Sequence, residues 1–97
     1  MEDIDVVREG GAARGRYVIH LPDGHEAEMT FGRRDPATVV VDHTFVPPEF
    51  RGHGLAEKLV QTLIADARRE GFRIVPVCSY VAVQFRRHPE WADLRAQ

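Results

Sequence analysis

The strongest constraint on the fold is one long amphipathic segment, residues 55–71, which stands between two segments rich in β-branched residues. Its apolar residues recur every three to four positions and form a stripe broad enough to dock on a sheet. That stripe comprises Leu55, Ala56, Leu59, Val60, Leu63, Ile64 and Ala67. Residues 38–46, with three consecutive valines, and residues 73–78 have the composition of strands. A strand, a helix and a strand in this order predict a βαβ-like unit.

Before this unit the sequence predicts antiparallel strands. Residues 16–21 and 25–31 alternate apolar and polar side chains, which is the period of a half-buried strand. Between them Pro22-Asp23-Gly24 predicts a turn, because proline presets φ and glycine accepts a positive φ. Residues 4–7 are predicted to form a short first strand, and residues 9–13 a loop.

After the unit, residues 79–87 are predicted to form a short second helix with Ser79 as its N-cap, and a proline at position 89 ends it. The predicted order is β-β-β-β-α-β-α. Alternation of this kind favours an α/β (α+β) fold in which helices pack on a sheet. A chain of 97 residues has room for one such domain, spanning residues 1–97.

Composition excludes several classes of protein. The apolar share is 43% and the charged share 29%, near the average of globular proteins, and no apolar run is long enough to cross a membrane. The acidic start, Met1 to Asp5, lacks the layout of a signal peptide. A single cysteine, Cys78, excludes an internal disulfide framework. These features predict a cytoplasmic protein that does not associate with a membrane.

Charge and histidine spacing argue against two kinds of ligand. The net charge of −2 does not favour a nucleic-acid binder held by bulk positive charge. None of the five histidines stands at a metal-ligand spacing from another, so no metal site is expected.

The strongest indication of a functional site lies at the end of the segment 38–46. Two prolines, Pro47 and Pro48, end this strand, a loop with two glycines follows, and the long helix begins at Leu55. The free N–H groups and positive dipole end of a helix start attract anions, and glycines let a ligand approach the backbone. The segment therefore predicts a site for a phosphate-bearing ligand at residues 51–56, although neither a P-loop nor a Rossmann spacing is present.

Residues 51–56, Arg-Gly-His-Gly-Leu-Ala, resemble the R/Q-x-x-G-x-G/A motif of the GNAT superfamily, the acetyl-CoA-dependent N-acetyltransferases. The chain is similar above all to the short stand-alone GNAT-like proteins of about a hundred residues. That similarity runs from His43-Thr44 through Val75-Pro76-Val77-Cys78 to Arg86-Arg87-His88-Pro89-Glu90.

The resemblance implies a minimal GNAT fold with a mixed, mostly antiparallel sheet and a V-shaped gap between strands 38–46 and 73–78. Acetyl-CoA would lie in that gap as co-substrate, with its pantetheine arm on the backbone near Phe45 and Val46 and its pyrophosphate on the loop. The residues so assigned to CoA are Phe45, Val46, Arg51, Gly52, His53, Gly54, Leu55, Ala56, Ser79, Arg86 and Arg87.

Acetyl transfer needs a deprotonated amine and a proton for the leaving thiolate. His43 and its neighbour Asp42 lie where many superfamily members carry a base, and as strand neighbours they are expected to point to opposite faces. Of the two, histidine is the residue type better suited to act as a base at neutral pH. Arg86 stands where many members carry the tyrosine that protonates the thiolate. Cys78, beside the gap and before a helix, is the substitute: it could give that proton or accept the acetyl group.

Several alternatives remain open from the sequence. The amine acceptor could be a protein N-terminus, a lysine, a polyamine or a small amine, and the chain is expected to be a monomer or a weak homodimer. His43 and Cys78 could equally be structural residues. Because the usual tyrosine is missing, the alternative to an N-acetyltransferase is a non-catalytic module that binds CoA or acetyl-CoA.

Overall fold

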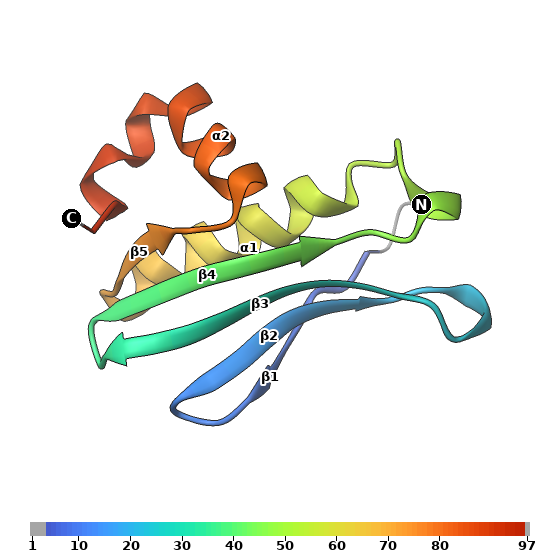
Figure 1. Cartoon of the computed structure of the whole chain (residues 1–97), viewed down its shortest axis with the longest axis horizontal. Coiled ribbons are helices and arrows are strands. Elements are labelled where there is room, and N and C mark those ends of the chain that lie inside the picture. Colours follow the sequence, from blue (N-terminus) through green and yellow to red (C-terminus); the bar gives the residue numbers. More distant parts are fainter. Residues whose placement is uncertain (1–3, 97) are drawn as a thin grey trace.

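A computed structural model describes residues 4–96 and contains one five-stranded sheet with two α-helices (Figure 1). The strands are β1 (Val7–Gly10), β2 (Arg14–His20), β3 (Glu26–Asp35), β4 (Thr38–Phe45) and β5 (Arg73–Pro76). The helices are α1 (Leu55–Glu70) and α2 (Ser79–Arg87). Three short 3₁₀ turns lie elsewhere in the chain, at Pro22–Gly24, Pro48–Phe50 and Pro89–Leu94.

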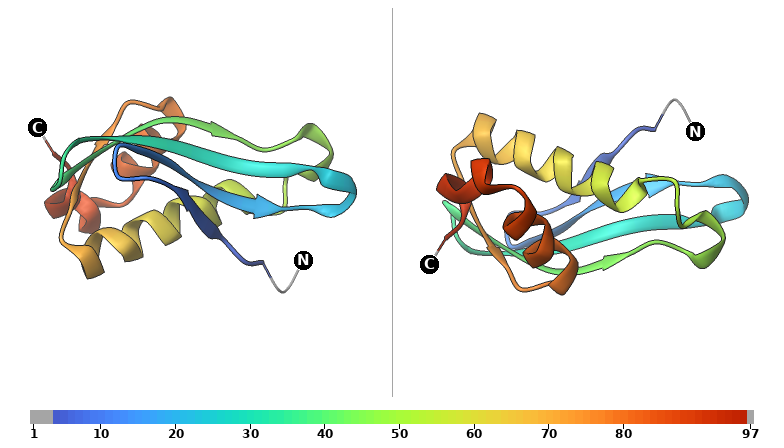
Figure 2. Two further views of the ribbon diagram at one scale, coloured as in Figure 1. Left: turned by 90° about the horizontal axis from the view of Figure 1, so that it is seen from below. Right: turned by 90° about the horizontal axis from the view of Figure 1, so that it is seen from above.

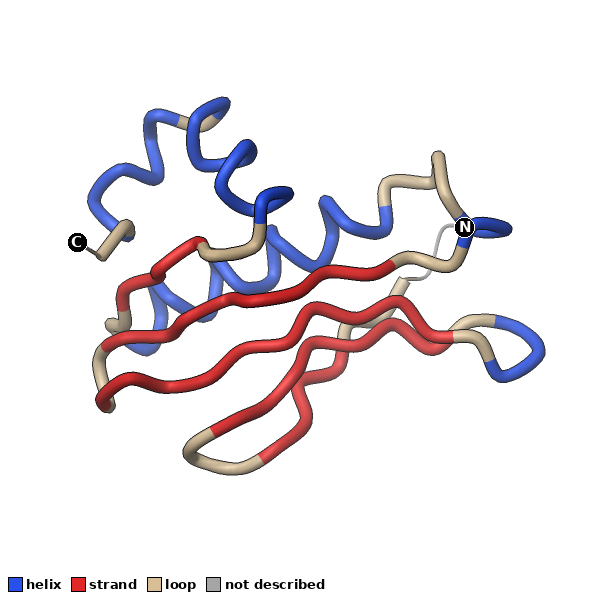
Figure 3. The backbone as a smooth tube through the Cα atoms, in the orientation of Figure 1, coloured by secondary structure: helices blue, strands red, loops and turns tan. Residues whose placement is uncertain are grey.

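The strands follow one another across the sheet in sequence order, β1-β2-β3-β4-β5. Neighbours are antiparallel except β4 and β5, which are parallel and are connected through α1. Figure 3 shows the four N-terminal strands as a continuous meander before the single crossover. The predicted α/β class, the order of elements and the mostly antiparallel sheet are confirmed.

The first strand lies further along the chain than the sequence suggested. β1 covers Val7–Gly10, so residues 9 and 10, predicted as loop, belong to a strand. Gly10 opposes Gly15 in the β1–β2 pair, and a Cβ on Gly10 would lie 2.5 Å from the Gly15 Cα. The close approach of these two glycines allows a tight hairpin. Local composition alone predicted a loop here.

The start of α2 also differs from the prediction. β5 ends at Pro76, and Cys78 rather than Ser79 is the N-cap of α2, with no side-chain hydrogen bond to cap it. The backbone N–H groups of Val77 and Cys78 both donate to the Val41 carbonyl, at 3.0 and 2.9 Å. These two bonds turn the chain away from β4 before the helix begins.

The core lies between the sheet and α1, which packs along one face of the strands (Figure 2). Leu55, Leu59 and Leu63 of the predicted stripe are at most 2% exposed, and they contact inward residues of β2 and β3 such as Tyr17 and Met29. Helix α2 lies by β5 and adds Val81 and Phe85 to the same cluster. The start of α1 follows the end of β4 through residues 46–54, so the two lie at the same end of the sheet.

Candidate functional site

The site begins where β4 and β5 part. Their parallel pairing runs from Thr38–Arg73 to Val41–Pro76 and stops there. Beyond Val41, β4 continues to Phe45 and is paired with β3 on its other side only, within the described chain. One edge of residues 42–45 is therefore free of strand partners, as the V-shaped gap requires.

A β-bulge on β4 lies at the point of separation. The β3–β4 register shifts between Phe31–Val41 and Thr30–His43, so Asp42 is an extra residue. A bulge bends and twists the strand that carries it. We attribute the divergence of β4 from β5 to this bend, together with the turn of Val77 and Cys78 onto the Val41 carbonyl.

The loop after β4 presents unpaired N–H groups. Gly54, the N-cap of α1, has a φ of 74° and makes no side-chain cap, and the first helical bond runs from Lys58 N to Gly54 O. The N–H groups of residues 55–57 therefore have no partner within the helix. Gly52 also has a positive φ, 86°, and a Cβ on either glycine would meet nothing within 4 Å. The two glycines are needed for backbone conformation, and the space above them is open.

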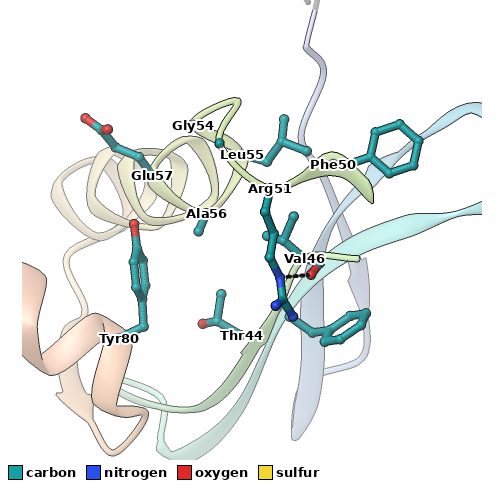
Figure 4. A pocket seen from close by; sticks show the side chains of 11 residues that line it. Thr44, Val46, Phe50, Arg51, Gly54, Leu55, Ala56, Glu57 and Tyr80 are labelled. Atoms are coloured by element: carbon teal, nitrogen blue, oxygen red, sulfur yellow. Dashed lines mark hydrogen bonds between the residues drawn. The ribbon is translucent and has the colours of Figure 1, made fainter. Parts of the chain in front are cut away.

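The gap and this loop join in one pocket of about 390 Å³, drawn in Figure 4. Seven predicted cofactor residues line it: Phe45, Val46, Arg51, Gly52, Gly54, Leu55 and Ala56. Four others, His53, Ser79, Arg86 and Arg87, do not line it in the described chain. Four lining residues had not been predicted: Thr44, Phe50, Glu57 and Tyr80.

Comparison with known proteins shows the family and the fold of the chain. A family model described as GCN5-related N-acetyltransferase matches residues 16–94. The chain belongs to this family. Its fold is also that of a GCN5-like N-acetyltransferase candidate from Staphylococcus aureus, solved by NMR in solution. The two chains are 23% identical, the match covers 99% of this chain and 91% of the other, and the TM-score is 0.74.

Tyr80 is the most informative residue that sequence reasoning missed in this member of the GCN5-related N-acetyltransferase family. It is the second residue of α2, and its ring forms a wall of the pocket opposite Arg51, with the hydroxyl toward Glu57 (Figure 4). Burial raises the pKa of Tyr80, and the carboxylate of Glu57 raises it further. The raised pKa keeps the hydroxyl protonated at the pocket wall, a position that only the packing of α2 reveals.

Cys78 lies at the apex of the gap. Its Sγ is 3.4 Å from the Thr44 hydroxyl, so it connects the start of α2 to the separated part of β4. The side chain is half-buried, and its thiol is free. Thr44 in turn lines the pocket, so the cysteine is one contact away from the cavity.

The prediction that Asp42 and His43 point to opposite faces is wrong. His43 pairs with Thr30, and Asp42 accepts a hydrogen bond from the Thr30 hydroxyl at 2.5 Å, so both side chains lie on the face away from α1. The bulge causes this, because it interrupts the alternation of faces. The Thr30 hydroxyl, and then Arg14, hold the pKa of Asp42 below its usual range, whereas His43 is exposed.

Among residues 4–96, no three histidine, cysteine, aspartate or glutamate side chains gather as they would around a metal ion. Neither helix of that part of the chain is long and apolar enough to span a bilayer.

Proposed function

We propose that this chain binds acetyl-CoA in the pocket and transfers the acetyl group to an amine. The observation that carries the proposal is the continuity of the free β4 edge with the open loop at the start of α1. An extended pantetheine arm carries amide groups that can hydrogen-bond to such an edge as an added strand does. The N–H groups of residues 55–57 offer an anion site at its far end, which suits the pyrophosphate.

The charged residues around the pocket support the same ligand. Arg51 lines the pocket beside the loop and can reach a phosphate. Arg87 stands seven residues after Tyr80, which puts both on one face of α2, whereas Arg86 is on another face. We assign Arg87, rather than Arg86, to the peripheral phosphates of CoA. His53, within the loop, and Ser79, the first residue of α2, are given no contact with the ligand.

The reaction would take place near the apex of the gap. A neutral amine attacks the thioester carbonyl, a tetrahedral oxyanion forms, and the CoA thiolate leaves and takes up a proton. His43 is exposed on the outer face of β4 and would accept the proton of an amine approaching from that side. Cys78, beside Thr44, would supply the proton for the CoA thiolate. A cytoplasmic location gives access to acetyl-CoA.

A substitution at Gly54 tests whether acetyl-CoA binds at the start of α1. A Gly54→Glu variant puts a bulky anion where the pyrophosphate would bind, so we expect affinity for acetyl-CoA by calorimetry to fall about tenfold or more. Gly71→Glu is the matched control, because Gly71 ends the same helix with a φ of 81° and equally open surroundings. Both variants carry similar backbone strain, so equal affinities in the two would refute this binding site.

A substitution at Cys78 distinguishes acetyl transfer from binding of acetyl-CoA alone. A Cys78→Ala variant should bind acetyl-CoA as the wild type does, because Cys78 does not line the pocket, but it should lose acetyl transfer to an amine. The readouts are calorimetry and product formation in an amine screen. If wild type and variant bind alike and neither turns over any amine, the chain is a CoA-binding module, and if both turn over equally, Cys78 is a packing residue.

A further inference from the structure

The side chain of Arg51 folds back onto the pocket in which it lies. Its Nε donates a hydrogen bond of 3.0 Å to the carbonyl of Val46, and both residues line the cavity (Figure 4). Arg51 is exposed, and in residues 4–96 this carbonyl is the hydrogen-bond partner of its guanidinium. A single solvent-exposed bond therefore holds the side chain across the pocket.

The Val46 carbonyl follows directly on the free edge of β4, which ends at Phe45. It is thus one of the backbone acceptors that an amide N–H of a pantetheine arm would use in the function proposed above. While Arg51 donates to the Val46 carbonyl, its Nε–H occupies one lone pair of that oxygen. The guanidinium then lies on the pocket side of the carbonyl. The pantetheine arm and the Arg51 side chain consequently compete for the same acceptor.

Whether Arg51 or the pantetheine amide binds the Val46 carbonyl depends on whether the ligand also carries a diphosphate. A hydrogen bond from a guanidinium to a phosphate joins two charged groups and is stronger than one to a neutral carbonyl. The loop at the start of α1, where a diphosphate would bind, begins with Arg51 itself. A ligand with a diphosphate can therefore draw the guanidinium off Val46, whereas a neutral ligand offers it nothing better.

We propose that Arg51 makes the pocket select acyl thioesters that carry a diphosphate over thioesters of phosphate-free pantetheine. Its guanidinium leaves the Val46 carbonyl for the diphosphate, and the freed carbonyl then accepts a pantetheine amide. The inference rests on the proposed binding of acetyl-CoA and adds a specificity-determining residue to it.

The test compares acetyl-CoA with S-acetylpantetheine, which lacks phosphate, in wild type and in Arg51→Met. The methionine keeps an unbranched side chain as far as the position of Nε and removes the guanidinium with every donor. We expect Arg51→Met to bind acetyl-CoA about tenfold more weakly and S-acetylpantetheine several-fold more tightly than the wild type does. Arg34→Met is the control, because Arg34 is exposed on β3 and its substitution removes the same charge away from the pocket.

Opposite changes for the two ligands would support the proposal. If Arg51 only contacts phosphate, S-acetylpantetheine binds equally to wild type and Arg51→Met, and that result would overturn it. Arg51 Nε–H resonances in ¹⁵N NMR give a second readout: acetyl-CoA should shift them and S-acetylpantetheine should not. Failure of acetyl-CoA to bind the wild type would refute the proposed function as well, and so is distinguishable from failure of the Arg51 proposal alone.

Discussion

Asp66 is the residue whose environment departs most from its sequence pattern. It lies outside the predicted apolar stripe of α1, yet it is only 7% exposed. Its carboxylate accepts hydrogen bonds from the Tyr17 hydroxyl at 2.8 Å, from Arg8 at 3.2 Å and from Arg69. Because these donors come from β1, β2 and α1 itself, the buried charge is satisfied and ties the N-terminal strands to the helix.

Tyr17 makes the stability of the protein depend on pH at the alkaline end. Burial raises the pKa of its phenol well above the ordinary value, and the hydrogen bond to Asp66 adds to the rise. In the unfolded chain a tyrosine titrates near pH 10, so above that pH the unfolded state loses a proton that the folded state keeps. The contribution of Tyr17 is therefore fully present below about pH 10 and is lost as pH rises further.

We expect the free energy of unfolding, measured in urea, to fall between about pH 9 and 11 in the wild type, and to fall less steeply in Tyr17→Phe. Tyr80→Phe is the comparison, because Tyr80 is the other of the two tyrosines and is only half-buried. It should retain most of the slope. Identical slopes in wild type and Tyr17→Phe would contradict the assignment.

At the scale of the elements, the bulge in β4 decides whether a site exists. Inward residues Val41 and Thr44 are separated by two outward ones, Asp42 and His43, instead of one. Removal of Asp42 would restore strict alternation without moving any other side chain of β4 to the opposite face. It would also remove the bend to which we attribute the gap between β4 and β5.

Deletion of Asp42 should therefore leave a folded protein whose strands stay paired beyond Val41 and whose affinity for acetyl-CoA falls about tenfold or more. Asp42→Ala keeps the extra residue, so it should bind normally at a stability cost of about 1 kcal/mol for the lost bonds to Thr30 and Arg14. Circular dichroism and calorimetry provide the measurements. Normal binding by a folded deletion variant would show that the bulge is not what opens the gap.

At the scale of the whole molecule, one hydrophobic cluster joins the sheet to both helices and to the C-terminal turn. The chain has a single tryptophan, Trp91, whose ring stacks on His88 at 4.0 Å and meets Phe85 edge-on at 5.7 Å. Ala96 also donates a backbone hydrogen bond to Ile74 of β5. The C-terminal turn is therefore part of the packed structure and should not unfold separately.

We expect urea unfolding followed by Trp91 fluorescence and by far-ultraviolet circular dichroism to coincide, as a two-state transition requires. Leu59→Ala, at a fully buried position of α1, should lower the free energy of unfolding by about 2–5 kcal/mol. Both curves should shift together to lower urea. A fluorescence transition at lower urea than the dichroism transition would mean that the C-terminal turn is a separate unit.

The sequence by itself determined the order of elements, the extent of α1 and the loop that carries Gly52 and Gly54. These features depend on local properties: the period of apolar residues, the backbone freedom of glycine and the inability of proline to continue a strand. The resemblance of residues 51–56 to a known motif identified the family on the same local segment. Seven of the eleven residues assigned to the cofactor consequently line the pocket.

Only the tertiary structure decided the strand register, the burial of Asp66, and the positions of Tyr80 and of the Arg51 side chain. Each depends on residues distant in the chain: the bulge at Asp42 on the pairing with β3, and the Tyr80 wall on the packing of α2 near α1. A strand's period shows that it has two faces but not where its register slips. The physical reason is that register and burial are set by contacts between elements, and no local pattern encodes those contacts.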